Sequence, residues 1–154
     1  VEFEGDREKF GDQELTEMLE RKNMSHIRSP DIINDKITLE GSKIGQGVFN
    51  QYCMACHQSD GKGDSGRFPS LVDTDWVNGD KQRLINLVIN GMNGPIEVNG
   101  EPFDGLMPQH SFLSDEDIAD VLTYIRTNFG NNSSPVSNDE IAKFRKTNSR
   151  LKKN

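Results

Sequence analysis

The sequence predicts an all-α fold that carries one small β-hairpin. Apolar residues recur at helical spacing in residues 44–52 and again in residues 118–129. Between these segments, the pair Asn99-Gly100 separates two short alternating runs, which is the strongest local signal for a hairpin. The chain has 154 residues, enough for one domain with extensions, but only 32% of them are hydrophobic. We therefore expect a bound group to supply part of the core.

Three parts are expected along the chain: an N-terminal extension of residues 1–40, a domain of residues 41–130 and a C-terminal tail of residues 131–154. In the extension, residues 13–22 place apolar side chains on one helical face. Residues 23–40 are rich in isoleucine but also contain proline, serine and asparagine. We expect this stretch to lie against the domain as an extended segment.

Two helices are expected in the domain before the hairpin. In the first, Gly45 stands four residues before Phe49 and leaves room for another helix to approach closely. The second is expected at residues 81–90, with Asp80 as its N-cap and Gly91 as its end. The stripe of the first helix is expected to face the core and consists of Ile44, Val48, Phe49 and Tyr52.

The helix after the hairpin has the clearest boundary signals. Ser114 and Asp117 form a pair that resembles a capping box, and acidic residues fill the first turn, where they favour the positive end of the helix dipole. Gly130 is expected to end this helix. In the tail, Ser137 and Glu140 form a second capping box, which predicts a short basic helix directly after it.

The segment Cys53-Met54-Ala55-Cys56-His57 has the spacing of a covalent attachment site for a c-type haem. One helical turn can present both sulfurs to the two vinyl groups on neighbouring edges of a porphyrin. The imidazole of His57 then lies beneath the ring, where it can bind the iron. The fold prediction thus becomes a set of helices around one covalently bound haem, and this haem supplies the missing apolar mass.

Two other uses of a cysteine pair fit this chain less well. A structural zinc site needs four ligands, usually as two separated pairs. The chain has two cysteines, and His26 and His110 are not spaced as a second pair. A thioredoxin-like redox pair requires a βαβ context, and the residues around the motif do not show that pattern.

The iron needs a sixth ligand on the face opposite His57, and we expect it to be Met107. This residue lies in a predicted loop before the long capped helix, and Pro108 stiffens the backbone directly after it. Met92, beside Gly91, is the second candidate. His110 would give bis-imidazole ligation instead, and is otherwise expected at the surface. The remaining candidates are Met18, Met24 and His26, and the two methionines are expected to be core filler.

From residue 41 to 130 the chain resembles the class I, monohaem cytochrome c family. Cytochrome domains that are attached to, or work with, quinoprotein sugar dehydrogenases and copper nitrite reductases are especially similar. The features that carry the resemblance are Gly45 and Phe49 before the haem motif, Pro69 after it, Gly105-Leu106-Met107-Pro108, and the helix that carries Tyr124.

The resemblance implies several roles. The carbonyl of Pro69 would accept a hydrogen bond from the free ring nitrogen of His57, which orients the imidazole and raises its basicity. Arg67 and Trp76 would face the haem or its propionates. The first and last helices would cross, with Gly45, Phe49, Val121 and Tyr124 at the contact.

We therefore expect an electron carrier and not an enzyme, with a six-coordinate His57 and Met107 haem. It would shuttle single electrons between a dehydrogenase or reductase and another redox protein, such as a quinoprotein dehydrogenase, a nitrite reductase or a terminal oxidase. The resemblance implies a periplasmic or otherwise extracytoplasmic location, since bacteria attach c-type haem outside the cytoplasm, with a membrane anchor possible in a longer precursor. The alternatives are a haem sensor or ligand-binding protein in which Met107 is labile, and a targeting module.

Hydropathy and charge indicate which classes of partner to expect. Without a run of 18 apolar residues, the sequence predicts no transmembrane segment. Residues 41–130 carry twelve acidic and six basic side chains, a net charge of −6, and residues 139–154 have a net charge of +4. The basic tail lacks the interleaved aromatic residues of a nucleic-acid surface, so no nucleic-acid partner is expected. The acidic domain favours a redox partner with a basic docking face.

Overall fold

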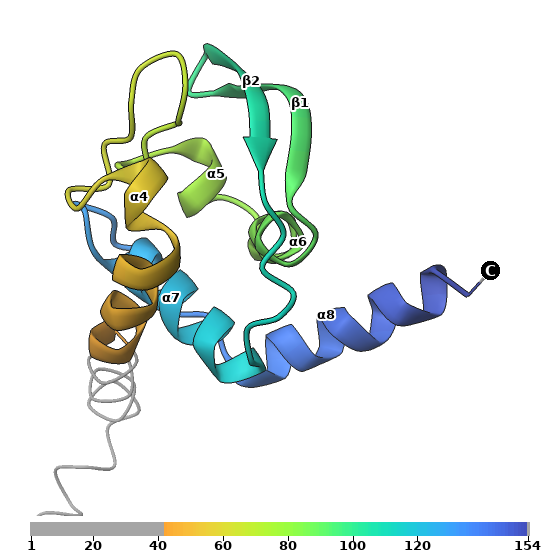
Figure 1. Ribbon diagram of the computed structural model, residues 1–154. Helices are drawn as coiled ribbons and strands as arrows, with labels where there is room; N and C mark the ends of the chain where they lie inside the picture. The colour runs from red at the N-terminus through yellow and green to blue at the C-terminus, as the bar shows by residue number, and fades with distance from the viewer. Residues whose placement is uncertain (1–41, 154) are drawn as a thin grey trace, which may run out of the picture. The chain divides into compact units, whose positions relative to one another are not determined.

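The computed structural model describes residues 42–153 (Figure 1). The helix predicted at 13–22, the extended segment 23–40 and the candidates Met18, Met24 and His26 lie outside these residues. Within them, the prediction of a mostly helical chain with one two-stranded antiparallel sheet is confirmed. Residues 42–52 are helical and lead into the labelled elements, which are α4 (Met54–His57), α5 (Asp75–Asn78), α6 (Lys81–Asn90), β1 (Met92–Val98), β2 (Glu101–Met107), α7 (Asp115–Thr127) and α8 (Asn138–Leu151).

The helix of residues 42–52 crosses α7 in close contact at Gly45. A Cβ atom at this position would lie 2.0 Å from the carbonyl oxygen of Asp120, so the two backbones meet directly. The Phe49 side chain is fully buried beside the contact, and its ring centroid is 5.5 Å from that of Tyr124. The predicted stripe was partly wrong, since Ile44 is 56% exposed and Tyr52 is 37% exposed. The close approach of α7 needs the smallest residue, so Gly45 occupies the inner face and Ile44 is rotated outward.

The caps predicted for α6 and α7 are confirmed. The Asp80 carboxylate accepts from the Gln82 amide over 2.9 Å at the start of α6, and the Ser114 hydroxyl accepts from the Asp117 amide over 3.0 Å at the start of α7. The end of α7 was predicted too late, because the helix stops at Thr127 instead of Gly130. Shortly after this end, Phe129 has a left-handed backbone conformation. Its ring centroid lies 5.3 Å from that of Phe49 in the core.

The hairpin forms around Asn99 and Gly100, which both have positive φ, as a type I′ turn requires. Its strands are longer than the sequence indicated and pair from Val98 opposite Glu101 to Met92 opposite Met107. Pro102 lies within β2 and does not end it. Proline has no N–H to donate, but each strand of a two-stranded sheet has a free edge where no donor is needed. Met107 is therefore the last residue of a strand and not part of a loop.

The tip of the hairpin is fastened to α5. Asp75 and Asn99 exchange two hydrogen bonds, with the Asp75 amide 2.9 Å from Asn99 Oδ1 and the Asn99 amide 3.0 Å from Asp75 Oδ1. The indole of Trp76 donates to Glu97 O over 2.8 Å. These bonds hold the sheet against the short helix that follows the haem motif loop.

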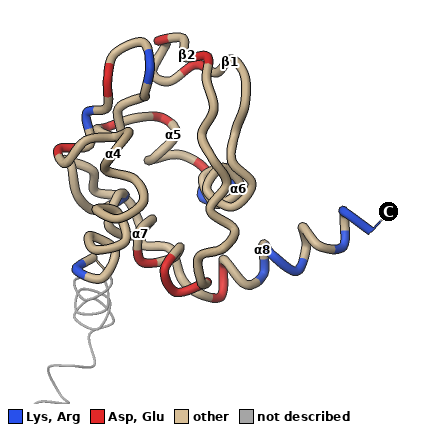
Figure 2. Tube along the Cα trace, in the orientation of Figure 1, with Lys and Arg blue, Asp and Glu red and all other residues tan. Residues whose placement is uncertain are grey.

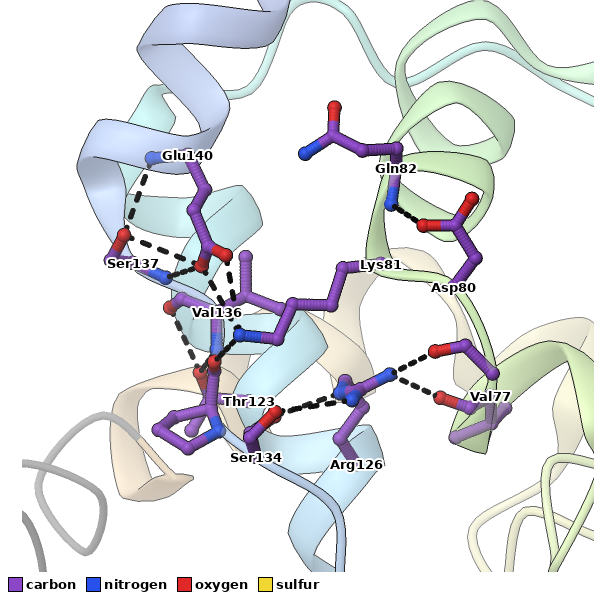
Figure 3. Close-up of polar contacts among 12 residues, drawn as sticks. Val77, Asp80, Lys81, Gln82, Thr123, Arg126, Ser134, Val136, Ser137 and Glu140 are labelled. Atoms are coloured by element: carbon purple, nitrogen blue, oxygen red, sulfur yellow. Dashed lines mark hydrogen bonds and ion pairs between the residues drawn. The ribbon is translucent and has the colours of Figure 1, made fainter.

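The C-terminal residues pack on the same core. Val136 and Ile141 are buried, and the capping box of Ser137 and Glu140 is present at the start of α8. Figure 3 shows how the buried guanidinium of Arg126 supports this junction. It donates to Val77 O over 2.7 Å and to Ser134 O over 2.8 Å, and so joins α5, α7 and the segment before α8.

Candidate haem site

The residues that the sequence analysis assigned to the haem line one cavity. Its walls come from α4, α5, α6, the hairpin and α7, and its empty volume is about 1180 Å³ including the solvent at its mouth. Its side chains are mostly apolar, so it suits a large apolar ligand. The expected residues in its lining are Cys53, Cys56, His57, Arg67, Pro69, Trp76 and Met107.

Cys53 and Cys56 reach this cavity from one helical turn. The Cys53 amide donates to Phe49 O over 2.9 Å, and the His57 amide donates to Cys53 O over 3.0 Å, so the helical path continues through the motif. Both thiols are free and partly buried. Burial, and then the neighbouring Cys56, raise the pKa of the Cys53 thiol to about 11, which leaves it neutral at neutral pH. Two free thiols on one turn fit the double attachment of a single porphyrin.

The imidazole of His57 is fixed by a backbone carbonyl. Its Nδ1 donates to Pro69 O over 3.0 Å, and since a carbonyl can only accept, Nδ1 carries the proton and Nε2 keeps a free lone pair. Burial lowers the pKa of His57, the Pro69 bond opposes this change, and the charge of His110 lowers the pKa further. A neutral imidazole with one ring nitrogen fixed by a carbonyl is the form that binds iron.

Two methionines share one wall of the cavity. Met92 and Met107 are paired across the hairpin, so their side chains lie on the same face of the sheet. Met107 also packs against the buried hydrophobic core. Its main chain touches the end of α6, where a Cβ on Gly91 would lie 2.6 Å from Met107 O. The structure thus brings both thioether candidates to the cavity.

His110, the third candidate, lies in the interior and not at the surface, where it was expected. It is only 8% exposed and lines the same cavity. Its ring centroid lies 6.5 Å from that of Tyr52 and 5.8 Å from that of Phe112, and its amide donates to Val88 O over 2.9 Å. Tyr52 and Val88 lie far from His110 in the sequence, so a lone histidine in the sequence does not reveal this position.

Arg67 and Trp76 occupy different parts of the lining. The Arg67 side chain is 74% exposed and its guanidinium lies 5.3 Å from the ring centroid of Phe68, so it stands at the mouth. The Trp76 ring is half-buried, and the guanidinium of Arg83 covers it at 4.1 Å. The hydrogen bond of Trp76 to the hairpin fixes the ring in the wall, so it can shape the space for a ligand.

Comparison with known proteins decides the family. The family model for cytochrome c matches residues 42–129. The chain belongs to the cytochrome c family. Members of this family carry covalently attached haem c and transfer electrons, and Cys53, Cys56 and His57 of this cytochrome fit the attachment motif. The lone pair on His57 Nε2 and the two free thiols in one apolar cavity are consistent with this group.

Relatives of this cytochrome include both single proteins and subunits. Cytochrome c-552 of Thermus thermophilus is 34% identical over 110 residues, which cover 66% of this chain and 83% of that protein. The cytochrome c subunit of gluconate 2-dehydrogenase from Pantoea cypripedii is 32% identical over 114 residues, 70% of this chain and 25% of the subunit. The cbb3-type cytochrome c oxidase subunit CcoP of Rhodobacter capsulatus is 32% identical over 85 residues, 53% of this chain and 28% of the subunit.

One residue that shapes the site of this cytochrome was not predicted from the sequence. Asn131 is buried, and its side chain joins the loop after Pro69 to α7 by accepting from the Asp73 amide over 2.8 Å and donating to Leu71 O and Ile125 O over 2.9 Å each. In a stretch of Asn, Ser and Pro, it resembled an ordinary loop residue.

Across residues 42–153, no helix has the length and apolar character needed to cross a membrane.

Proposed function

We propose that this cytochrome is a one-electron carrier with a single six-coordinate haem in a class I cytochrome c fold. In this proposal, Cys53 and Cys56 attach the haem, and His57 and Met107 bind its iron. The observation that carries the proposal is the meeting of four groups in one apolar cavity: two free thiols, an imidazole with a free Nε2 and a thioether. The haem-binding unit would be residues 41–130.

The bound haem supplies an iron that is oxidised and reduced by one electron. The chain holds the imidazole in one tautomer through Pro69, which keeps Nε2 available as a ligand. A neutral sulfur ligand from Met107 favours the ferrous state and raises the potential. The apolar wall excludes water from the iron. We place Arg67 near the haem propionates because it lies at the mouth of the cavity, and Trp76 against the ring because it lines the wall.

Optical spectra of the purified holoprotein test this function. If His57 and Met107 occupy both axial positions, the ferric protein is low-spin and shows the weak sulfur-to-iron band in the far red. The ferrous protein then shows no rapid change when it is mixed with carbon monoxide, because no position on the iron is open. Immediate, complete binding of carbon monoxide would favour the alternative function, a haem sensor with a labile methionine.

The proposed partners of this cytochrome are redox proteins. The proposed location of the cytochrome is outside the cytoplasm. Its relatives include subunits of a dehydrogenase and of an oxidase, which supports a donor or acceptor of this kind, such as a quinoprotein dehydrogenase, a nitrite reductase or a terminal oxidase. Figure 2 shows the charge that such a partner meets, with acidic residues at the hairpin and basic residues along the far part of α8. The acidic residues of the hairpin and the α5 region are exposed and comprise Asp73, Asp75, Asp80, Glu97, Glu101 and Asp104.

We predict that these carboxylates speed electron exchange with cationic reagents. Two of them, Glu97 and Asp104, are exposed on the strands that flank the cavity. At low salt, a cationic oxidant should react faster than an anionic oxidant of matched potential. The rate should fall as the Debye length shrinks from about 30 Å at 0.01 M to about 8 Å at 0.15 M ionic strength. Stopped-flow absorbance of the haem measures this rate.

Replacement of both carboxylates in Glu97→Gln/Asp104→Asn should reduce the salt dependence. The matched control is Glu116→Gln, which removes an exposed charge from the first turn of α7. A rate that stays flat or rises with salt would show that electrostatic steering does not act at this face, and that apolar contacts carry the docking.

A further inference from the structure

One guanidinium from α8 holds the loop that follows Met107. Arg145 Nη1 donates to Ser111 O over 3.0 Å, and Nη2 donates to Leu113 O over 2.5 Å. Its Nε lies 2.7 Å from Asp115 Oδ1, an ion pair at the first residue of α7. The three contacts span five residues of the loop and the helix start. They use the planar fork of arginine, which lysine cannot reproduce.

Few side chains hold this loop apart from Arg145. Pro108, Gln109, Ser111 and Phe112 are exposed, and Phe112 is 66% exposed. Only His110 and Leu113 are buried between Met107 and the cap of α7. An exposed loop with so little apolar burial opens easily unless polar contacts restrain it.

The loop is fastened at two ends. At the Met107 end, the backbone packs on Gly91, and the His110 amide donates to Val88 O over 2.9 Å. At the α7 end, the carbonyls on both sides of Phe112 are held by Arg145. The first fastening is made by α6 and the second by α8, so the segment that follows Met107 is restrained by two different helices.

We propose that Arg145 is a positioning residue for the axial methionine. It keeps the loop of residues 108–114 closed and so holds the Met107 thioether in the haem cavity. The proposal rests on the proposed ligation by Met107. The family model ends at residue 129, and α8 lies beyond it, so this control of the ligand loop comes from a part of the chain outside the matched cytochrome region.

Competition with an added ligand measures how often Met107 leaves the iron. Imidazole can bind ferric iron only when the methionine is displaced, so its apparent affinity is proportional to the fraction of open loop. We expect Arg145→Leu to bind imidazole about tenfold more tightly than the wild type, equivalent to about 1.4 kcal/mol. Loss of the far-red band during a titration of the ferric holoprotein gives the affinity.

The matched control breaks another polar anchor of α8. Lys81 donates to Pro135 O over 2.7 Å and lies 3.2 Å from Glu140 Oε1, in the first turn of α8 (Figure 3). Lys81→Leu should weaken the docking of α8 and lower the midpoint of denaturant unfolding, yet leave the affinity for imidazole within twofold of the wild type. Arg145→Lys keeps the charge beside Asp115 but loses the fork, so its affinity should lie between those of the wild type and Arg145→Leu.

The outcomes separate this proposal from the ligand assignment. Equal affinities in the wild type and Arg145→Leu would overturn the positioning role, as would an equal increase in Lys81→Leu. If Arg145→Leu does not fold with haem, the affinity of Arg145→Lys decides the question in the same way. A wild-type protein that lacks the far-red band would instead disprove ligation by Met107.

Discussion

Replacement of Met107 with alanine should abolish the far-red sulfur-to-iron band of the ferric protein completely. The thioether is the proposed sixth ligand, and alanine offers no group that can bind the iron. Water then takes the open position, the ferric spectrum becomes high-spin, and the ferrous protein binds carbon monoxide on mixing. The reduction potential should also fall, by on the order of 0.1 to 0.2 V, within the roughly 0.8 V that axial ligands span. Optical spectra and a redox titration measure these changes.

Met92→Ala is the matched control for this experiment. Met92 lines the same cavity and is the direct cross-strand partner of Met107, so the two variants remove the same side chain from neighbouring places. Met92→Ala should keep the band, the low-spin spectrum and the resistance to carbon monoxide. If the band disappears in Met92→Ala and persists in Met107→Ala, the ligand is Met92 and the assignment of Met107 is wrong.

Gly45→Ala should destabilise the holoprotein by about 2 to 3 kcal/mol, in the range known for overpacked cores. The added methyl carbon would lie 2.0 Å from Asp120 O and 2.8 Å from the Cβ of Tyr124. The first of these atoms belongs to the backbone of α7 and cannot rotate away, so the two helices must separate. Phe49 and Tyr124, whose rings pack beside the contact, would lose part of their packing. Denaturant unfolding followed by circular dichroism measures the change.

Gly47→Ala provides the control within the same helix. Apart from the neighbouring backbone of its own helix, no heavy atom lies within 4 Å of the position where its Cβ would stand, so the methyl group enters open space. Alanine favours a helix over glycine by up to about 1 kcal/mol, and we expect Gly47→Ala to be neutral or more stable than the wild type. If both substitutions change the free energy of unfolding alike, the crossing at Gly45 does not limit the stability of this fold.

Local signals along the chain predicted much of the structure. The caps at Asp80, Ser114 and Ser137 and the Asn-Gly turn act within a few residues, so their chemistry is visible in the sequence. The spacing of the haem motif is equally local, because a single helical turn presents both thiols. These features predict the helices, the hairpin and the cofactor without any knowledge of long-range contacts.

Other features depend on elements that are far apart in the sequence. The register of the hairpin made Met107 a strand residue opposite Met92, although the flanking Gly and Pro residues indicated a loop. Asn131 resembles a loop residue in the sequence, but in the structure it is buried and its side-chain amide joins α7 to the loop after Pro69. In each case, a hydrogen-bonding partner or a packing neighbour lies many residues away, and no local pattern contains that information.

The sequence by itself therefore determined which groups are the candidates to hold the haem: the two cysteines, His57 and a methionine near residue 107. It also determined where most helices begin, since caps and turns are satisfied by neighbouring residues. The sequence also indicated a close helix approach at Gly45, but the tertiary structure alone decided that Ile44 is rotated outward, because the short distance between the two backbones puts Gly45 on the inner face. It also placed Arg145 of α8 over the loop after Met107, a contact that exists only once both helices have packed on the same core.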